Sequence, residues 1–233
     1  MAQSRALASA LLARLPMFQH VARPQLAELA RQALERQAAA GSVVARRGEV
    51  PPGLMIVRYG LVKLSLIGES ERVLRLVGPG ETFGEAAMFL GQPLPVDVSA
   101  LADTALLVVP AAPLLALIER DPRFARALLA SVCQRLQMLV MDFEATTLHG
   151  ARERLAAYLD SLAPRDAAAA SIQLPAPKSV IASRLGMTKE TLSRLLRALI
   201  DEGLIEVSRR DISLLDRARL AAAARGSSGL AGG

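Results

Sequence analysis

The sequence predicts an α+β protein in which a small β-roll, a long helix and a winged helix-turn-helix follow one another along the chain. Short runs of Val, Leu and Ile separated by glycines occupy residues 42–109, as is typical of a small barrel or roll. Apolar residues three and four positions apart indicate a long helix that begins near residue 121. Near residue 186, two short helical patterns meet at a glycine, as in a helix-turn-helix.

The chain has 233 residues, enough for two small domains. We expect N-terminal helices and a β-roll over residues 1–120, the long helix over 121–149, the winged helix-turn-helix over 150–220 and a disordered tail over 221–233.

Composition excludes several kinds of site. Cys133 is the only cysteine, which rules out an internal disulfide and a four-cysteine iron–sulfur cluster. The two histidines, His20 and His149, are too few for most metal centres, so we expect no metal site. Aromatic residues make up 3% of the chain, which argues against single-strand binding by base stacking.

The apolar stretches do not predict a membrane span or a signal peptide, because the uncharged segment at 104–118 is short and contains prolines. We therefore expect a cytoplasmic protein without a membrane partner. The net charge is +6, and residues 151–233 carry the larger part of it. This distribution indicates a polyanion as the partner of the C-terminal part.

The N-terminal part is predicted to change from helix to strands. Residues 4–38 show helical spacing of Leu and Ala, and Pro24 suits the start of a helix. Strands are then expected in the apolar runs SVVA, LMIVRYG, LVKLSLI, ERVLRLV and ALLVV, without an assigned register.

The long helix has a clear start and a narrow apolar stripe. Asp121 is a good N-cap, and Pro122 suits the first helical position. The stripe has the 3,4 spacing of a coiled-coil seam, which favours a homodimer. Its expected interface residues are Leu129, Val132, Leu136, Leu139 and Phe143. The alternative is a helix that packs only on its own β-roll. Cys133, beside the stripe, is expected to be a small buried apolar residue.

Residues 178–203 carry the sharpest motif of the chain. A second helix is expected after His149 and Gly150, followed by a polar, alanine-rich connector and the helix-turn-helix. Gly186 permits the turn, Thr188 is a good N-cap for the second helix of the motif, and Gly203 ends it. The residues expected to face the core are Leu192, Leu195, Leu196, Leu199 and Ile200.

The opposite face of this helix has side chains that suit a DNA major groove. An Arg donates two hydrogen bonds to guanine, a Glu accepts from cytosine and a Ser contacts a base or a phosphate. Polar residues at the helix N-terminus and basic residues at the tip of the following hairpin suit phosphates. The candidate DNA-binding residues are Thr188, Lys189, Glu190, Ser193, Arg194, Arg197, Arg209 and Arg210. The alternative is an ordinary solvated helix face.

The order of these parts, over about residues 15–220, resembles the CRP/FNR family of bacterial transcription regulators. The resemblance rests on RRGE at 46–49, YGLVKL at 59–64, GETFGEAAMF at 80–89 and IASRLGMTKETLSRLLRALIDEGLI in the C-terminal part. It implies a cyclic-nucleotide-binding-like sensor domain and a homodimer that binds double-stranded DNA. ETLSR at 190–194 looks like the FNR and DNR type of recognition helix, which implies TTGAT half-sites. Lys189 and Ser193 depart from the CRP type.

The sensor pocket departs from the cyclic-nucleotide pattern of the family. Gly84 and Glu85 match the pair that holds the ribose, but residues 95–99 contain Asp97 and no arginine for the phosphate. Cyclic AMP is therefore not expected, because a buried phosphate needs a cationic partner. Met88 and Phe89 belong to a segment that is most similar to the DNR subgroup, which implies haem in an apolar pocket. The subgroup's histidine pair corresponds to Leu15 and Pro16 here, so the resemblance assigns no iron ligand.

We therefore expect a ligand-responsive, DNA-binding transcription regulator, with RNA polymerase as a partner if it activates. A signal in the roll would change how the long helices pack across the dimer and reset the spacing of the recognition helices. The alternative is a cyclic-nucleotide-responsive regulator or a module of a signalling complex. The sequence does not predict an enzyme, because it shows no Gly-rich phosphate loop, no Ser/His/Asp set and no metal-ligand spacing.

Overall fold

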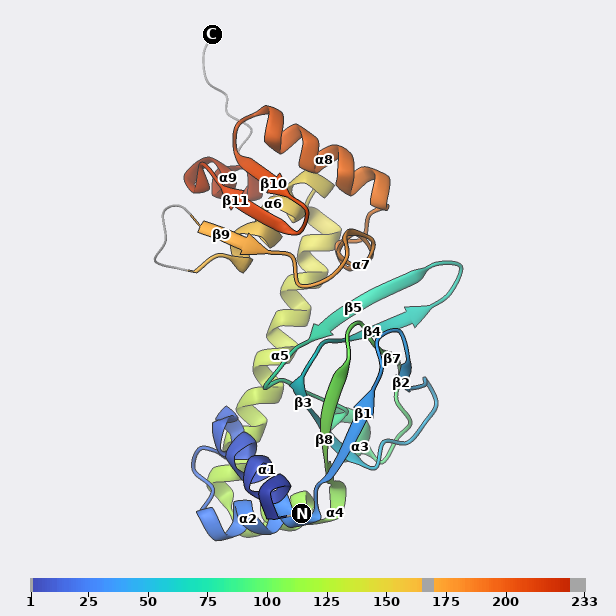
Figure 1. The fold of residues 1–233 in the computed structure, drawn as a ribbon, viewed down its shortest axis with the longest axis vertical. Helices are drawn as coiled ribbons and strands as arrows, with labels where there is room; N and C mark the ends of the chain where they lie inside the picture. Colours follow the sequence, from blue (N-terminus) through green and yellow to red (C-terminus); the bar gives the residue numbers. More distant parts are fainter. Residues whose placement is uncertain (1, 165–169, 227–233) are drawn as a thin grey trace. The chain divides into compact units, whose positions relative to one another are not determined.

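The computed structural model describes residues 2–164 and 170–226 (Figure 1). The chain forms two units, Met1–Gln137 and Met138–Gly233. The first unit holds the β-roll and the second the helix-turn-helix, so the predicted α+β class is confirmed.

The N-terminal helices end earlier in the chain than predicted. Its helical elements are α1 (Ala2–Arg14), the 3-10 helix η1 (Pro16–Phe18) and α2 (Arg23–Gln32). The helix predicted over residues 4–38 is wrong at its end, because β1 (Leu34–Ala38) is a strand paired with β8 (Thr104–Pro110). Four of the five β1 side chains are exposed, so β1 has no alternating apolar pattern, and its pairing with β8 makes it a strand.

Two antiparallel four-stranded sheets make up the β-roll. Their strand orders are β1-β8-β3-β6 and β2-β7-β4-β5. The remaining strands are β2 (Val43–Ala45), β3 (Gly53–Tyr59), β4 (Val62–Ile67), β5 (Glu71–Val77), β6 (Thr82–Phe83) and β7 (Asp97–Ala100). Each of the five apolar runs that predict a strand contains one, while β6 and β7 were not predicted.

Two apolar clusters stabilise this unit. Between the sheets, Met55, Val57 and Val98 are almost completely buried. At the helical end, Phe18 stacks on Phe124 with their ring centroids 5.1 Å apart. Figure 1 shows α1, α2 and α4 (Ala111–Arg120) gathered around the beginning of α5 at this end. Each buried side chain of this size contributes about 1.5–3 kcal/mol to folding.

The long helix α5 (Pro122–Leu148) begins where the sequence predicts. Asp121 Oδ1 accepts hydrogen bonds from the backbone N–H groups of Arg123 (2.9 Å) and Phe124 (3.2 Å), which confirms its role as the N-cap. Buried side chains of α5 lie near its beginning, at Phe124 and Leu128. Among the helices of the described residues, none combines the length and apolar character that crossing a bilayer requires.

The second unit contains the predicted winged helix-turn-helix. Its helices are α6 (Ala151–Leu162), α7 (Lys178–Arg184), α8 (Lys189–Asp201) and α9 (Arg217–Ala224). Its strands are β9 (Ala170–Gln173), β10 (Ile205–Ser208) and β11 (Asp211–Leu214), in the order β10-β11-β9. The predicted hairpin is confirmed, with Ser208 opposite Asp211.

One prediction in this unit is wrong, and another falls largely outside the described residues. The connector predicted at PRDAAAAS (164–171) lies mostly at 165–169, outside the described residues, and its last two residues, Ala170 and Ser171, begin β9, which pairs with β11. The tail predicted over residues 221–233 starts too early, because residues 221–224 belong to α9. Asp216 accepts from the backbone N–H of Arg219 (2.9 Å), and Leu220 is fully buried, so α9 has both a cap and a core contact. Residues 227–233 of that tail lie outside the described residues.

Candidate nucleic-acid interface and ligand pocket

The start of α8 is set by hydrogen bonds of two kinds. Gly186 has a left-handed φ of 66°, and the N–H of Met187 donates to the carbonyl of Ala182 (3.0 Å), which closes the end of α7. Thr188 Oγ1 then accepts from the N–H of Thr191 (3.1 Å), so Thr188 caps α8 as predicted.

Helix α8 separates its apolar and polar side chains onto two faces. Leu192, Leu196 and Leu199 are buried, while Leu195 and Ile200 are half-buried, in agreement with the predicted core face. The exposed residues of the opposite face are Thr188, Lys189, Glu190, Ser193, Arg194 and Arg197. This face presents the donors, acceptors and positive charge that base edges and phosphates require.

The two arginines of this face differ in their surroundings. Arg197 Nε lies 3.2 Å from Asp201 Oδ1 in an exposed ion pair one helical turn further on. Among the described residues, Arg194 has no such carboxylate partner. Its guanidinium therefore does not have to leave a carboxylate before it contacts a base.

The β10–β11 hairpin carries a basic tip. Arg209 and Arg210 form its two-residue turn, and both side chains are exposed. Arg209 has a left-handed φ of 56°, which is uncommon for a residue other than glycine. The hairpin thus presents two adjacent cations close to α8 in the sequence, in the arrangement of a wing.

Side chains of α6 hold the helix-turn-helix in place. The guanidinium of Arg184 lies over the ring of Tyr158, 5.9 Å from its centroid. Burial raises the pKa of the Tyr158 hydroxyl, and the positive charge of Arg184 opposes that shift. Arg152 donates two hydrogen bonds, of 2.7 and 2.6 Å, to the carboxylate of Glu202 at the end of α8.

The sensor pocket contains an ion pair that sequence reasoning missed. Gly84 precedes α3 (Glu85–Leu90) with a left-handed φ of 89°, which favours glycine there. Glu85 is buried and forms an ion pair with Arg135 of α5, which also donates to Thr82 Oγ1. Fifty residues separate Glu85 from Arg135 in the chain, so the local sequence carries no signal for this contact.

The apolar part of this region is nearly filled by side chains. The side chains that surround this region leave no room for a water molecule between them: Met17, Leu54, Glu85, Met88, Phe89, Leu114, Phe124 and Leu128. The structure therefore brings Glu85, Met88 and Phe89 together.

Asp97, also predicted for the pocket, lies elsewhere. Its Oδ1 accepts from the backbone N–H of Arg47 (3.1 Å), and it is paired with Ser65 across β4 and β7. Ser65 and Lys63 both donate to Glu71 nearby. Although burial acts to raise the pKa of Glu71, these hydrogen bonds bring it below its ordinary value. Asp97 thus belongs to a polar cluster on the sheet.

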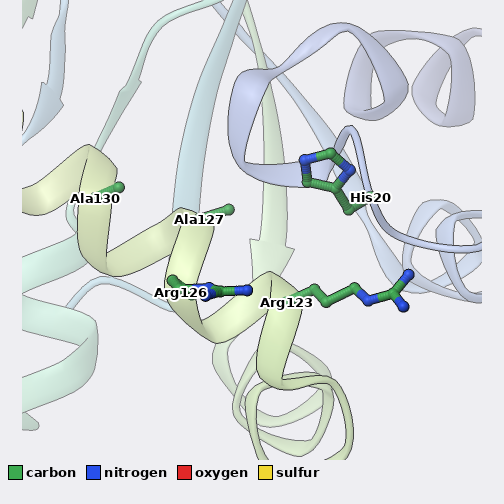
Figure 2. Close-up of a pocket in the computed structure, with 5 residues that line it drawn as sticks. All are labelled: His20, Arg123, Arg126, Ala127 and Ala130. Atoms are coloured by element: carbon green, nitrogen blue, oxygen red, sulfur yellow. The ribbon is translucent and has the colours of Figure 1, made fainter.

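The histidines do not supply an iron ligand for the region around Glu85 and Met88. His20 lies at a surface cleft with Arg123, Arg126, Ala127 and Ala130, as Figure 2 shows. His149 follows the end of α5 and is half-buried. In the part of the chain that the structure describes, no three His, Cys, Asp or Glu side chains are placed to hold a metal ion. No histidine is among the side chains around Glu85 and Met88, so the residues of this region do not fit a histidine-ligated haem.

The apolar stripe of α5 is largely uncovered within the chain. Its residues are exposed by 40% or more: Leu129, Val132, Leu136, Leu139 and Phe143. Within the first unit, the roll therefore does not bury Leu129, Val132 or Leu136, which counts against the alternative that α5 packs only on its own roll. Cys133 is exposed as well, so the prediction of a buried Cys133 is wrong for the single chain.

Comparisons with known proteins match both halves of the chain. Residues 35–121 match the cyclic nucleotide-binding domain family, and residues 153–223 match the Crp-like helix-turn-helix domain family. The "Cyclic AMP receptor protein" of Thermus thermophilus is 30% identical over 88% of this chain and 94% of that protein.

Solved structures agree with these matches. FixK2 from Bradyrhizobium japonicum has a TM-score of 0.72 at 26% identity, over 81% of this chain and 95% of that chain. A transcriptional regulator of the CRP/FNR family from Thermus thermophilus has a TM-score of 0.65 at 28% identity, over 82% and 98% of the two chains.

Proposed function

Because this chain belongs to the CRP/FNR family of DNA-binding transcription regulators, which are not enzymes, we propose that it acts as a homodimer that binds an inverted DNA repeat through α8. The observation that carries this proposal is the exposed polar face of α8, which is capped at Thr188 and held over a buried leucine face. The site of action would be the cytoplasm, and RNA polymerase would be a further partner if the bound protein activates.

The proposed DNA site is an inverted repeat of TTGAT. Arg194, which is exposed, would donate two hydrogen bonds to guanine O6 and N7, and the exposed Glu190 would accept from the N4 amino group of the paired cytosine. Ser193 is available for a base or a phosphate. Lys189 and the Arg209–Arg210 wing would contact phosphates, which orient the protein without specifying sequence.

Regulation would pass from the roll to the dimer. The Glu85–Arg135 ion pair joins α3 of the roll to α5, one position before Leu136 in the apolar stripe. A signal that alters this region would change how the two α5 helices pack, and with it the spacing of the two α8 helices. Only one spacing matches half-sites that lie one DNA turn apart.

DNA binding by the wild-type chain tests the function. We expect fluorescence anisotropy to give a dissociation constant of about 10⁻⁸ M or lower at physiological salt for an inverted TTGAT repeat with half-site centres about 10 base pairs apart. A scrambled duplex of equal length and composition should bind about 10³-fold more weakly. Equal affinity for the two duplexes would contradict the proposal.

The match to the cyclic nucleotide-binding domain favours a second candidate, a regulator controlled by cyclic AMP. Residues 95–99 supply no cation for the phosphate, and Arg135, the cation beside Glu85, is already paired with that carboxylate. A nucleotide phosphate would have to compete with Glu85 for it.

We therefore expect no saturable heat when cyclic AMP is titrated into the protein in a calorimeter, and no change in DNA affinity. The same preparation must bind the TTGAT duplex, which shows that it is active. A micromolar dissociation constant, about −8 kcal/mol, would support the second candidate. Loss of that binding in Arg135→Met would then identify Arg135 as the phosphate ligand.

A further inference from the structure

The joint between α5 and α6 is short. α5 ends at Leu148 and α6 begins at Ala151, so only His149 and Gly150 separate them. Gly150 is extended, with φ −64° and ψ 160°, and its N–H donates to Glu153 Oε2 (2.8 Å). The first turn of α6 is therefore closely tied to the end of α5.

Arg154, in that first turn, contacts three backbone carbonyls. Its Nη1 donates to the carbonyl of His149 (2.6 Å), its Nε to that of Leu185 (2.9 Å) and its Nη2 lies 3.4 Å from that of Gly186. The side chain is half-buried, and the planar guanidinium carries donors in a fixed arrangement. One side chain thus joins the end of α5 to the turn of the helix-turn-helix.

The three carbonyls are available to accept hydrogen bonds from Arg154 because each lies at or just after the end of a helix. Helix α7 closes with bonds from Gly186 N–H to Ser183 (3.2 Å) and from Met187 N–H to Ala182 (3.0 Å), which leave the Leu185 and Gly186 carbonyls without a helical donor. His149 directly follows the last residue of α5. The partial negative charge at helix C-termini favours a cation at these positions.

The contacts of Arg154 bear on the start of α8. Residues 185–188 lead directly into α8, so bonds to Leu185 and Gly186 fix the point from which the recognition helix departs. Arg152, two residues earlier, reaches the far end of α8 through Glu202, and among the described residues it makes no hydrogen bond to α5. Arg154 therefore bridges the residue that follows α5 and the turn that precedes α8.

We propose that Arg154 is a positioning residue that fixes α8 relative to the end of α5, and so sets the half-site spacing that the dimer accepts. This proposal rests on the proposed function. A rotation at the end of α5 moves the His149 carbonyl, and Arg154 transmits that movement to the turn before α8. Without the guanidinium, α8 still presents its polar face, but its orientation relative to α5 varies.

The test compares Arg154→Met and Arg154→Lys with Arg152→Met as the matched control. Each protein is titrated with inverted TTGAT repeats that have the preferred half-site spacing, one base pair more or one base pair less. Wild type should prefer one spacing. Both Arg154 variants should reduce that preference by about fivefold, because a methionine makes none of the hydrogen bonds and a lysine cannot bridge all three carbonyls. Arg152→Met should keep the wild-type preference.

A purely structural role for Arg154 would lower affinity for all spacings alike and leave the preference unchanged, which would overturn the proposal. If Arg154→Lys kept the full wild-type preference for one half-site spacing, the proposal would be overturned too, since the planar guanidinium would then be unnecessary. Should Arg154→Met melt before it can be titrated, Arg154→Lys decides the outcome. Failure of the proposed function has a different signature, because wild type would then show no preference for TTGAT over scrambled DNA.

Discussion

Leu136→Glu is expected to leave the protein monomeric and unable to bind an inverted DNA repeat tightly. Leu136 lies in the middle of the apolar stripe of α5 and is 61% exposed in the single chain, so the substitution should not disturb the fold of the monomer. In a dimer joined along the stripe, the carboxylate would be buried without a partner. Burying such a charge costs about 3–5 kcal/mol, roughly two to four orders of magnitude in the dimer dissociation constant.

Sedimentation velocity at micromolar concentration measures this effect, with Gln134→Glu as the control. Gln134 lies on the same helix outside the stripe, so the control adds the same charge to α5 without entering the interface. It should remain dimeric and bind the repeat as wild type does. A dimeric Leu136→Glu protein would show that the stripe is not the interface.

Arg194→Ala is expected to cost about 1–3 kcal/mol on the TTGAT repeat and to remove the preference for guanine at one position of each half-site. The physical reason is the loss of a bidentate contact, which distinguishes guanine from every other base. Arg194 is exposed on the polar face of α8, so its removal should leave the leucine core of the motif intact. A series of half-sites substituted at each position, titrated at fixed salt, measures the change.

Lys189→Ala is the matched control for this series. Lys189 is exposed at the first position of α8, where a phosphate contact is expected. Its removal should weaken all sequences alike and reduce the slope of log K against log salt by about one. If Arg194→Ala behaves in this way instead, Arg194 contacts the backbone, and the base specificity assigned to α8 loses its main support.

Local residue patterns were enough to predict much of this protein. Asp121 begins α5, Thr188 caps α8 and Gly186 forms the turn between α7 and α8, each by hydrogen bonds to residues within a few positions. The five strand-forming runs and the two faces of α8 follow from side-chain periodicity in the same way. The candidate DNA-binding residues all lie on these elements, so their placement on one exposed face of α8 and on the hairpin tip was predictable.

Other features depend on residues that are far apart in the chain. β1 lacks an apolar alternation and becomes a strand because β8 offers it a backbone partner, and the four-residue β9 pairs in the same way with β11. Arg135 forms an ion pair with Glu85, while Asp97 accepts a hydrogen bond from the backbone N–H of Arg47.

By itself, the sequence determined where helices begin and which faces are apolar, because caps and periodicity act over a few residues. The tertiary structure alone decided which cation meets Glu85 and which carbonyls bind Arg154. The reason is that a long charged side chain accepts any of several partners, and the packing of distant elements determines which of them is close enough to bind.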